Sequence, residues 1–316
     1  MKTISVHDLT KIFGRLAAVD HISFSVEQGE AFGFLGPNGA GKTTIMMMLA
    51  TALNPTSGNA IVCGYDISKD KDRVRENISF IFQELSLDIN LTARENLDFH
   101  ARMYHLPEKT RKERISQVLD VVGLEDKQDM LVKHYSGGMQ RRLEIARGML
   151  THPKVLFLDE PTLGLDVQTR RLLWNYAREL NKEMGTTILL NTHYVEEADY
   201  LCDRVAILNH GRIVVTESPE KLKDSVGEGL LRLKLINDPS ENFIKMLREE
   251  SWVRKINQQE NWLELRIGNG SNRIPEVVRL ARKQGIIIAS ISQRKPSLED
   301  VFIHYVGGGL KDSQHG

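Results

Sequence analysis

Apolar and polar residues follow one pattern up to about residue 220 and a different one beyond it. In the first part, short runs rich in β-branched residues alternate with longer stretches of helical periodicity. Three apolar runs are expected to be strands: AFGFLG (31–36) runs into a glycine loop, while KVLFLDEP (154–161) and TTILLNTH (186–193) end in polar residues. Continuous runs of this kind are typical of interior strands of a parallel sheet. Strands that alternate with helices predict an α/β architecture for this part.

The same pattern predicts further elements between these runs. Two more strands are expected at HISFSVEQGE (21–30), where apolar and polar residues alternate, and at SGNAIVCGYDI (57–67). Helices are expected at TTIMMMLATAL (43–53), RKERISQVLDVVG (111–123), MQRRLEIARGML (139–150) and RRLLWNYARELNKEMG (170–185).

The pattern changes near Asp224–Leu230. Beyond this stretch we expect a strand, a helix, two strands around the turn QQEN (258–261), a helix and a strand. This βαββαβ order is that of ferredoxin-like domains. An amphipathic helix then ends the pattern, with one apolar face made of Leu298, Val301, Phe302 and Tyr305.

The chain therefore divides into two predicted domains, which suits its length of 316 residues. We expect the α/β domain at 1–225 and a small α+β domain at 228–308. The ending, 309–316, is expected to be disordered.

Composition narrows the functional classes. The 42 basic and 42 acidic residues balance, which disfavours binding to nucleic acid or to an anionic membrane through bulk charge. Cys63 and Cys202 have no metal-binding or redox spacing, so we expect two reduced thiols in a cytosolic protein. No signal peptide and no run of about 18 apolar residues is apparent.

A phosphate-binding loop is the strongest motif. Gly36, Gly41, Lys42 and Thr43 fit G-x-x-x-x-G-K-[ST], with a predicted strand before the loop and a predicted helix after it. Backbone N–H groups of such a loop wrap phosphates, the lysine adds a positive charge, and the hydroxyl can bind Mg²⁺. A chance glycine turn is the alternative, and the flanking elements argue against it. The residues expected to bind the nucleotide here are Gly36, Pro37, Asn38, Gly39, Ala40, Gly41, Lys42, Thr43 and Thr44.

A second acidic motif ends the strand VLFLD (155–159). Asp159 is expected to hold Mg²⁺ together with Thr43. Glu160 is expected to polarise the attacking water. Acidic residues often end strands, so this motif is informative only in combination with the phosphate loop.

With these two motifs and four others in the family's order, the sequence resembles the nucleotide-binding subunit of an ABC transporter over residues 3 to about 220. YSGGMQRR resembles the family signature, LGLD (163–166) the D-loop, and His193 the switch histidine; Gln83 stands at a strand end like the Q-loop glutamine. The resemblance implies a P-loop NTPase fold with a mixed sheet and a helical subdomain at about 86–150. Two departures, Leu163 and Val167, leave the details of the D-loop open.

For individual residues the resemblance implies roles that compete with simpler ones. Gln83 would contact Mg²⁺ and couple the site to a membrane partner, or be a solvated strand end. His193 would contact the γ-phosphate, or be an ordinary histidine. Asp166 would contact a second copy, cap the following helix, or do both. Phe13 would stack on adenine, or be a buried core aromatic.

The signature residues raise the question of a second anion site. Ser136 is a good N-cap, and Gly137 and Gly138 leave backbone N–H groups bare at a helix start. One nucleotide does not need two phosphate sites in one chain. The resemblance implies that two copies pack head to tail, with each ATP between one phosphate loop and the partner's Ser136, Gly137, Gly138 and Gln140. A tight loop into a helix is the simpler alternative.

The resemblance thus implies an ATP- and Mg²⁺-dependent ATPase that powers a separate membrane subunit from the cytoplasmic face. Residues 84–107 are the expected docking surface for that subunit. The ending SLEDVFIHYVGG resembles drug-resistance exporter ATPases of the daunorubicin type, which favours export. Soluble ATPases of DNA repair or translation are the alternative, although the chain has a single phosphate loop and lacks zinc-binding cysteine pairs. A module that binds ATP without cleaving it is disfavoured by Glu160 and His193.

Overall fold

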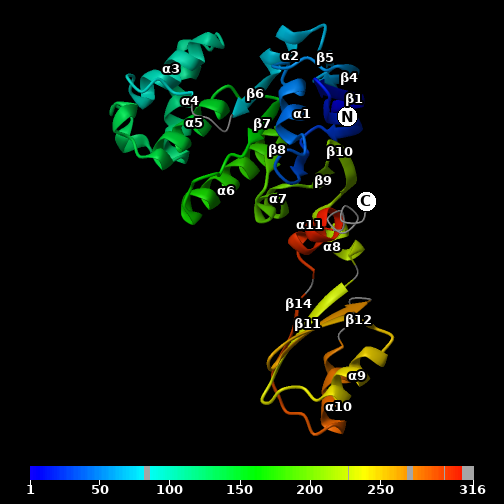
Figure 1. Cartoon of the computed structure of the whole chain (residues 1–316). Helices are drawn as coiled ribbons and strands as arrows, with labels where there is room; N and C mark the ends of the chain where they lie inside the picture. Colours follow the sequence, from blue (N-terminus) through cyan, green and yellow to red (C-terminus); the bar gives the residue numbers. More distant parts are fainter. Residues whose placement is uncertain (82–85, 227, 269–272, 295, 308–316) are drawn as a thin grey trace. The chain divides into compact units, whose positions relative to one another are not determined.

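The computed structural model describes residues 1–316 except 82–85, 227, 269–272, 295 and 308–316 (Figure 1). It forms two compact units, Met1–Ser218 and Pro219–Gly316. The division falls earlier than the expected boundary near residue 225, because helix α8 (Pro219–Ser225) contacts helix α11 (Leu298–Gly307) of the second unit. The tail 309–316, expected to be disordered, lies outside the described residues.

Two sheets build the first unit. The antiparallel sheet has the strand order β2 (Leu16–Glu27), β1 (Lys2–Phe13), β4 (Ser57–Val62) and β5 (Tyr65–Asp66). The larger sheet has the order β10 (Arg212–Glu217), β9 (Arg204–Asn209), β3 (Ala31–Leu35), β8 (Thr187–Thr192), β7 (Val155–Asp159) and β6 (Ile78–Ile81).

Most of the larger sheet is parallel, as its continuous apolar runs predict. Strands β3, β7 and β8 are buried at every position, and among the described strands of this sheet only β10 pairs in antiparallel fashion. The carboxyl ends of β3, β8, β7 and β6 therefore meet at one edge. This edge of the sheet holds the polar motifs.

Helix α1 (Lys42–Leu49) packs into the main core, which also contains Phe32 and Phe34 of β3. The aromatic rings of Phe24, Phe32 and Phe34 contact one another at centroid distances of 5.3–5.5 Å. This packing fixes the point at which the chain leaves β3 and enters α1. The other helices beside the sheets are α2 (Lys71–Asn77), α6 (Val167–Met184) and α7 (Val195–Leu201).

A helical subdomain has its own apolar core within the first unit. It consists of α3 (Ala93–Met103), α4 (Glu108–Val121), α5 (Gly137–Met149) and the short 3-10 helices Glu125–Lys127 and Val132–His134. These elements lie within the range of about 86–150 that the resemblance implies. Helix α5 also contacts β6, so the subdomain is joined to the edge of the larger sheet.

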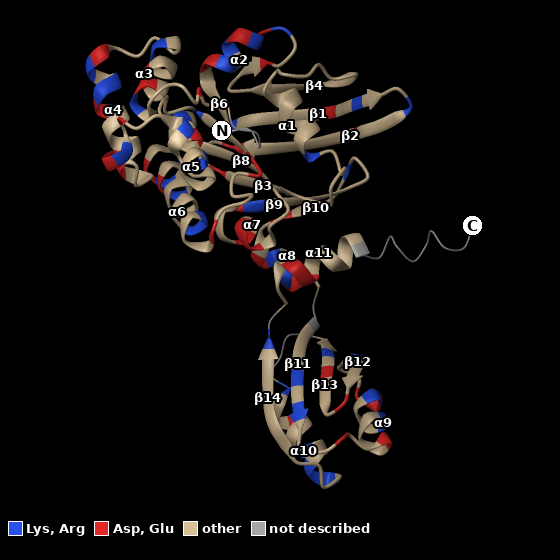
Figure 2. Ribbon diagram, turned by 60° about the vertical axis from the view of Figure 1, so that its left-hand side comes forward, with Lys and Arg blue, Asp and Glu red and all other residues tan. Residues whose placement is uncertain are grey.

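The second unit contains the expected βαββαβ order, confirming its ferredoxin-like class. Its elements are β11 (Glu228–Leu235), α9 (Glu241–Glu249), β12 (Val253–Gln259), β13 (Trp262–Gly268), α10 (Ile274–Lys283) and β14 (Ile288–Arg294). The sheet order is β12-β13-β11-β14 and all pairs are antiparallel. Residues of α9 and α10 pack on the leucines of one face, whereas Figure 2 shows Lys and Arg along the strands.

Among the described residues, no helix has both the length and the apolar composition needed to cross a bilayer.

Candidate nucleotide-binding site

The phosphate-binding loop lies between β3 and α1 and depends on two glycines. Gly41 has φ +98°, and a Cβ there would lie 2.3 Å from the backbone oxygen of Ala18. A Cβ on Gly36 would lie 2.7 Å from the backbone oxygen of Leu208. Any side chain at these positions would displace backbone, so the loop conformation requires glycine.

Lys42 begins α1, and its ammonium lies inside the loop. The side chain donates hydrogen bonds to the carbonyls of Gly36 (2.8 Å) and Pro37 (3.1 Å). Burial lowers the pKa of Lys42, while the charges of Glu160 and Asp159 oppose this shift. The loop is therefore organised around a buried positive charge, which suits an anionic ligand.

Three polar side chains from neighbouring elements meet beside the loop. The Thr43 hydroxyl donates to Asp159 Oδ1 (3.2 Å) and accepts from Asn191 Nδ2 (3.1 Å), while Asn191 also donates to Asp159. Burial raises the pKa of the Asp159 carboxyl, and the hydrogen bonds from Asn191 and Thr43 counteract it. The buried Asn191 Oδ1 has no hydrogen-bond partner. Hydroxyl, carboxylate and amide oxygens together suit Mg²⁺.

Glu160 and His193 form the next layer of the site. Glu160 Oε2 lies 2.6 Å from His193 Nδ1, and its side chain is 10% exposed against 41% for the histidine. Glu160 adopts the left-handed conformation, φ +49°, while its N–H donates to the carbonyl of Asn191 (2.9 Å). Such a conformation costs about 1–3 kcal/mol in a non-glycine residue, and here it occurs in the residue whose carboxylate contacts His193.

Two supporting residues were not singled out by sequence reasoning. Arg141 of α5 is buried and donates to the carbonyls of Pro161 (2.8 Å) and Glu160 (3.0 Å). Glu197 of α7 is fully buried and accepts from Thr162 (3.0 Å) and Trp174 (2.9 Å). Arg141 could have been found as a charged residue on an otherwise apolar helix face, and Glu197 as the second glutamate after His193.

Asn191 was also missed, although a polar residue inside the run TILLNT could have indicated it. The register pairs Asn191 with Asp159 of the neighbouring strand. Its side chain therefore bridges the two motifs that the sequence had identified separately.

The signature residues lie at the start of α5. Ser136 caps the helix by accepting from the N–H of Met139 (3.3 Å), as predicted. A Cβ on Gly137 or on Gly138 would meet no atom within 4 Å, and neither glycine has a positive φ. Gln140 donates to the carbonyl of Val132 (3.2 Å) within its own chain. Contacts within this chain therefore do not explain the two glycines.

Phe13, Asp166 and Gln83 are the remaining predicted site residues. Phe13 at the end of β1 is 49% exposed, with the Lys11 ammonium 5.1 Å from its ring centroid, so the alternative of a buried core aromatic is wrong. Asp166 caps α6 by accepting from the N–H (2.9 Å) and hydroxyl (2.7 Å) of Thr169. Gln83 lies outside the described residues.

Comparison with known proteins identifies the family of this site. The profile of the "ABC transporter" family matches residues 19–163. The daunorubicin/doxorubicin resistance ATP-binding protein DrrA of Streptomyces peucetius is 38% identical over 313 residues, which cover 98% of this chain and 94% of that protein. The chain belongs to the ABC transporter ATP-binding proteins. It is an ATP-binding, ATP-hydrolysing subunit, as the resemblance implied.

Further relatives extend the likeness to both units of this ABC protein. The linearmycin resistance ATP-binding protein LnrL of Bacillus subtilis (strain 168) is 34% identical over 98% of this chain and 100% of its own. The Nod factor export ATP-binding protein I of Ralstonia nicotianae is 35% identical over 98% and 95%. Residues 218–306 match the profile of the "ATP-binding protein DrrA1-3-like, C-terminal domain".

Solved structures resemble the ABC ATPase unit. A dimeric post-hydrolysis structure of the ATP-binding cassette MJ0796 with ADP and Pi has a TM-score of 0.63 at 26% identity, covering 68% of this chain and 98% of that one. A structure titled as the ATP binding subunit of an ABC transporter has a TM-score of 0.66 at 28% identity, covering 71% and 93%.

Proposed function

We propose that this ABC protein hydrolyses MgATP at composite sites between two copies and thereby drives export through a separate membrane subunit. The observation that carries the composite site is the pair Gly137 and Gly138, where side chains would meet nothing within 4 Å of their own chain. Backbone N–H groups left bare at a helix start bind anions, and the helix dipole favours negative charge there. The ligand would thus be the phosphate of an ATP held by the partner copy.

In this proposal each group has a distinct role. Lys42 exchanges its loop carbonyls for phosphate oxygens, and the loop N–H groups complete the charge stabilisation. Glu160 orients the attacking water in line with the γ-phosphate, and His193 holds Glu160 and contacts that phosphate. Phe13 stacks on the adenine.

Mg²⁺ would be held by Thr43 and Asp159, and by Gln83 as an expectation from the sequence. Mg²⁺ usually takes only one or two protein ligands and keeps its waters and the substrate phosphates, which this small donor set matches. The cation would neutralise charge on the phosphates. Asn191 orients both protein ligands through its amide.

The membrane partner is expected to dock on the helical subdomain. Large apolar side chains are exposed within the predicted docking segment 84–107, namely Ile89, Phe99, Met103 and Tyr104 at 38–61%. The named relatives are resistance and export ATP-binding proteins, which supports export and a position at the cytoplasmic face of the membrane. The chemical identity of the cargo depends on the membrane subunit.

A charge-neutral change at Glu160 tests the composite site. Glu160→Gln keeps the size of the side chain but weakens its interaction with water, so ATP should bind without turnover and accumulate a dimer. Size-exclusion chromatography with light scattering measures the mass with and without ATP. A Glu160→Gln protein that binds ATP yet remains monomeric would contradict the composite site.

A matched control uses an exposed glutamate of the same unit. Glu196→Gln, on α7, should hydrolyse ATP at the normal rate and should not accumulate the dimer. Co-purification with a membrane protein distinguishes the transporter from the soluble repair or translation classes.

A further inference from the structure

The open face of the second unit's sheet carries an ordered set of side chains to which neither the ATPase site nor the family comparisons assign a role. Directly paired residues of antiparallel strands point to the same face, so the register defines rows across the sheet. The sheet's other face is covered by α9 and α10, whose residues pack on Leu231, Leu233 and Leu265. The residues between those leucines therefore form the open face.

Three rows cross this open face. The first row contains Lys255, Arg266, Leu230 and Arg294; the second contains Asn257, Glu264, Arg232 and Ser292; the third contains Gln259, Trp262, Lys234 and Ser290. Successive rows lie two residues apart along each strand, so the first and third are about 13 Å apart. One end of the face carries Lys255, Arg266 and Arg294, and the other carries the indole of Trp262 between Gln259 and Lys234.

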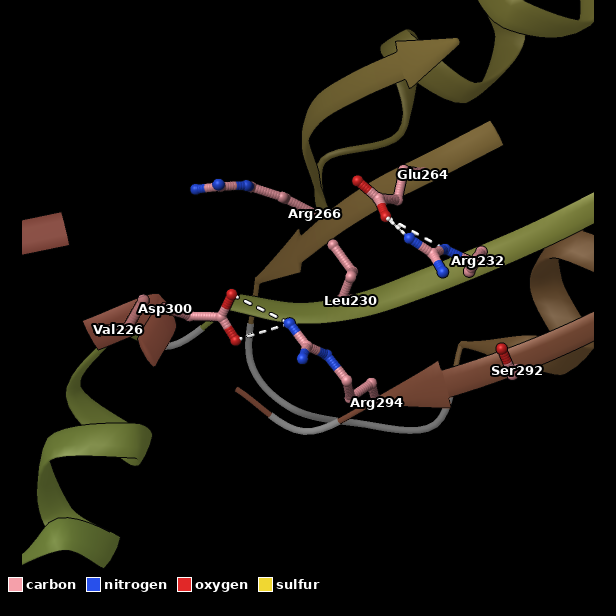
Figure 3. Close-up of a pocket in the computed structure, with 8 residues that line it drawn as sticks. All are labelled: Val226, Leu230, Arg232, Glu264, Arg266, Ser292, Arg294 and Asp300. Carbon is pink, nitrogen blue, oxygen red and sulfur yellow. Dashed lines mark hydrogen bonds and ion pairs between the residues drawn. The ribbon is translucent and has the colours of Figure 1, made fainter. Parts of the chain in front are cut away.

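The cationic end is hollowed. A cavity of about 290 Å³ is lined by Arg232, Arg266, Arg294 and Ser292, together with Leu230, Val226, Glu264 and Asp300 (Figure 3). Arg294 pairs with Asp300 of α11 (2.9 Å) and Arg232 with Glu264 (2.7 Å), and the side chains of both arginines are more than half exposed. Exposed pairs of this kind contribute little stability and exchange readily with a competing anion.

The aromatic end is hollowed as well. A neighbouring cavity of about 710 Å³ shares Arg232 and Glu264 with the first. It is lined by Trp262, Asn257 and Gln259, and also by Ile256, Gln258 and Leu263 of the same two strands. Trp262 is 38% exposed, and the cations of Arg232 and Lys234 lie 5.9 and 5.4 Å from its ring centroid. An aromatic platform beside amides suits a planar, hydrogen-bonding ring.

We propose that this open face is a second nucleotide site, distinct from the ATPase site, which takes a nucleotide with at least two phosphates. Its base would stack on Trp262 beside Asn257 and Gln259. Its phosphates would extend past Arg232 to Arg266 and Arg294, where guanidinium groups bind phosphate oxygens in pairs. The separation of the first and third rows calls for an extended phosphate chain rather than one phosphate.

A single nucleotide fits this face better than a nucleic acid strand. Four-stranded sheets that bind single strands present two or three aromatic rings, each stacking on one base. Here the open-face positions of β11 are Leu230, Arg232 and Lys234, and Trp262 is the one aromatic residue in the three rows. The face therefore offers one base platform.

Binding at the cationic end would also affect α11. Arg294 belongs to β14 and Asp300 to α11, and this ion pair links the sheet to the helix. Phosphate that competes with Asp300 for Arg294 would weaken the link. Nucleotide binding at this face would thereby change the attachment of α11 within the second unit.

The test is a titration of the full-length protein labelled with ¹⁵N-tryptophan, using ADP as the probe. The chain has three tryptophans, and Trp262→Phe assigns the indole N–H signal of the site. ADP should shift the Trp262 signal saturably, and the double variant Arg266→Gln/Arg294→Gln should weaken that response at least tenfold. Trp174 and Trp252, which are buried in the two units, report whether each unit remains folded.

Several outcomes would overturn the proposal. One is a Trp262 signal that does not change when ADP is added. Another is a shift of that signal in the double arginine variant as large as in the wild type, because ADP bound at the ATPase site would then be its cause. An eight-nucleotide single strand that binds more tightly than ADP would assign the face to nucleic acid instead. Pyrophosphate and adenosine should each bind more weakly than ADP.

A matched control places the same charge change on the covered side of the unit. Arg279→Gln/Arg282→Gln alters two exposed arginines of α10 and should leave the ADP response unchanged. Basal ATP hydrolysis should be normal in both double variants. The test thus separates this site from the proposed composite ATPase site.

Discussion

The ATPase site contains several buried charged residues, and Lys42 is the clearest case. It is 5% exposed and bonded to two loop carbonyls, so alanine removes the loop's only side-chain cation while the backbone N–H groups remain. We expect Lys42→Ala to lower kcat at least about 100-fold, the effect of losing one preorganised charge-stabilising group. A phosphate-release assay measures this. Full turnover in the variant would exclude the loop from the mechanism, and Lys182→Ala, an exposed lysine of α6, is the control.

Phe13 gives a second prediction at this scale. Stacking of a base on an aromatic ring is worth about 1–3 kcal/mol, so Phe13→Ala should weaken ADP binding by that amount. Phe13→Tyr keeps the ring and should bind normally. Titration calorimetry measures both affinities. Equal affinity of the alanine variant and the wild type, with the fold intact, would show that the exposed ring does not contact adenine.

Glu197 predicts a dependence of stability on pH. Burial raises the pKa of this carboxyl, with hydrogen bonds from Thr192, Trp174 and Thr162 working against the shift. The folded protein therefore holds a proton that the unfolded chain releases near the ordinary glutamate pKa of 4.5, so stability falls as pH rises above it. Glu197→Gln keeps the acceptor and should be more stable than the wild type at pH 8 but not at pH 4. Urea unfolding followed by tryptophan fluorescence checks this, and an equal effect of the substitution on stability at both pH values would refute it.

Among the elements, helix α5 connects the subdomain to the catalytic edge. Arg141 reaches from α5 to the carbonyls that follow β7, so the helix and the Glu160 turn are held together. Arg141→Lys retains charge but loses the forked geometry and should destabilise the first unit by about 1–3 kcal/mol and lower kcat. Denaturant midpoints and steady-state rates measure the two effects. The neighbouring Arg142→Lys should leave kcat unchanged, because Arg142 bonds to carbonyls within the subdomain.

The elements also show what sequence could and could not predict. The hydrophobic pattern predicted buried strands such as β7 and β8 and the order of elements in the second unit. It could do so because a buried strand or helix face requires apolar residues at a fixed spacing. Strand β1 was not predicted, because KTISVHDLTKIF carries register shifts that break strict alternation. Asn191 and Arg141 were missed because their contacts join segments distant in sequence, and only the assembled sheet brings those segments together.

At the scale of the whole molecule, we predict that a substitution at a signature glycine impairs the ATP-induced dimer without destabilising the monomer. Gly137→Ala has room for its Cβ and should keep or slightly raise the stability of the monomer, by up to about 1 kcal/mol. The same methyl group should obstruct the partner's phosphates and abolish the ATP-induced dimer. Gly148→Ala provides the contrast, because its Cβ would lie 2.5 Å from Ile81 and should destabilise the monomer itself. A Gly137→Ala protein that dimerises normally with ATP would refute the composite site.

The pairing of α8 with α11 has a consequence for how such a chain can diversify. The ferredoxin-like strands start directly after one of these helices and end directly before the other, so the chain enters and leaves that module at neighbouring points (Figure 1). A segment anchored in this way can be exchanged or lost without extending the path of the backbone. Different small domains could then be inserted between α8 and α11 while the sequence of the ATPase unit stays the same.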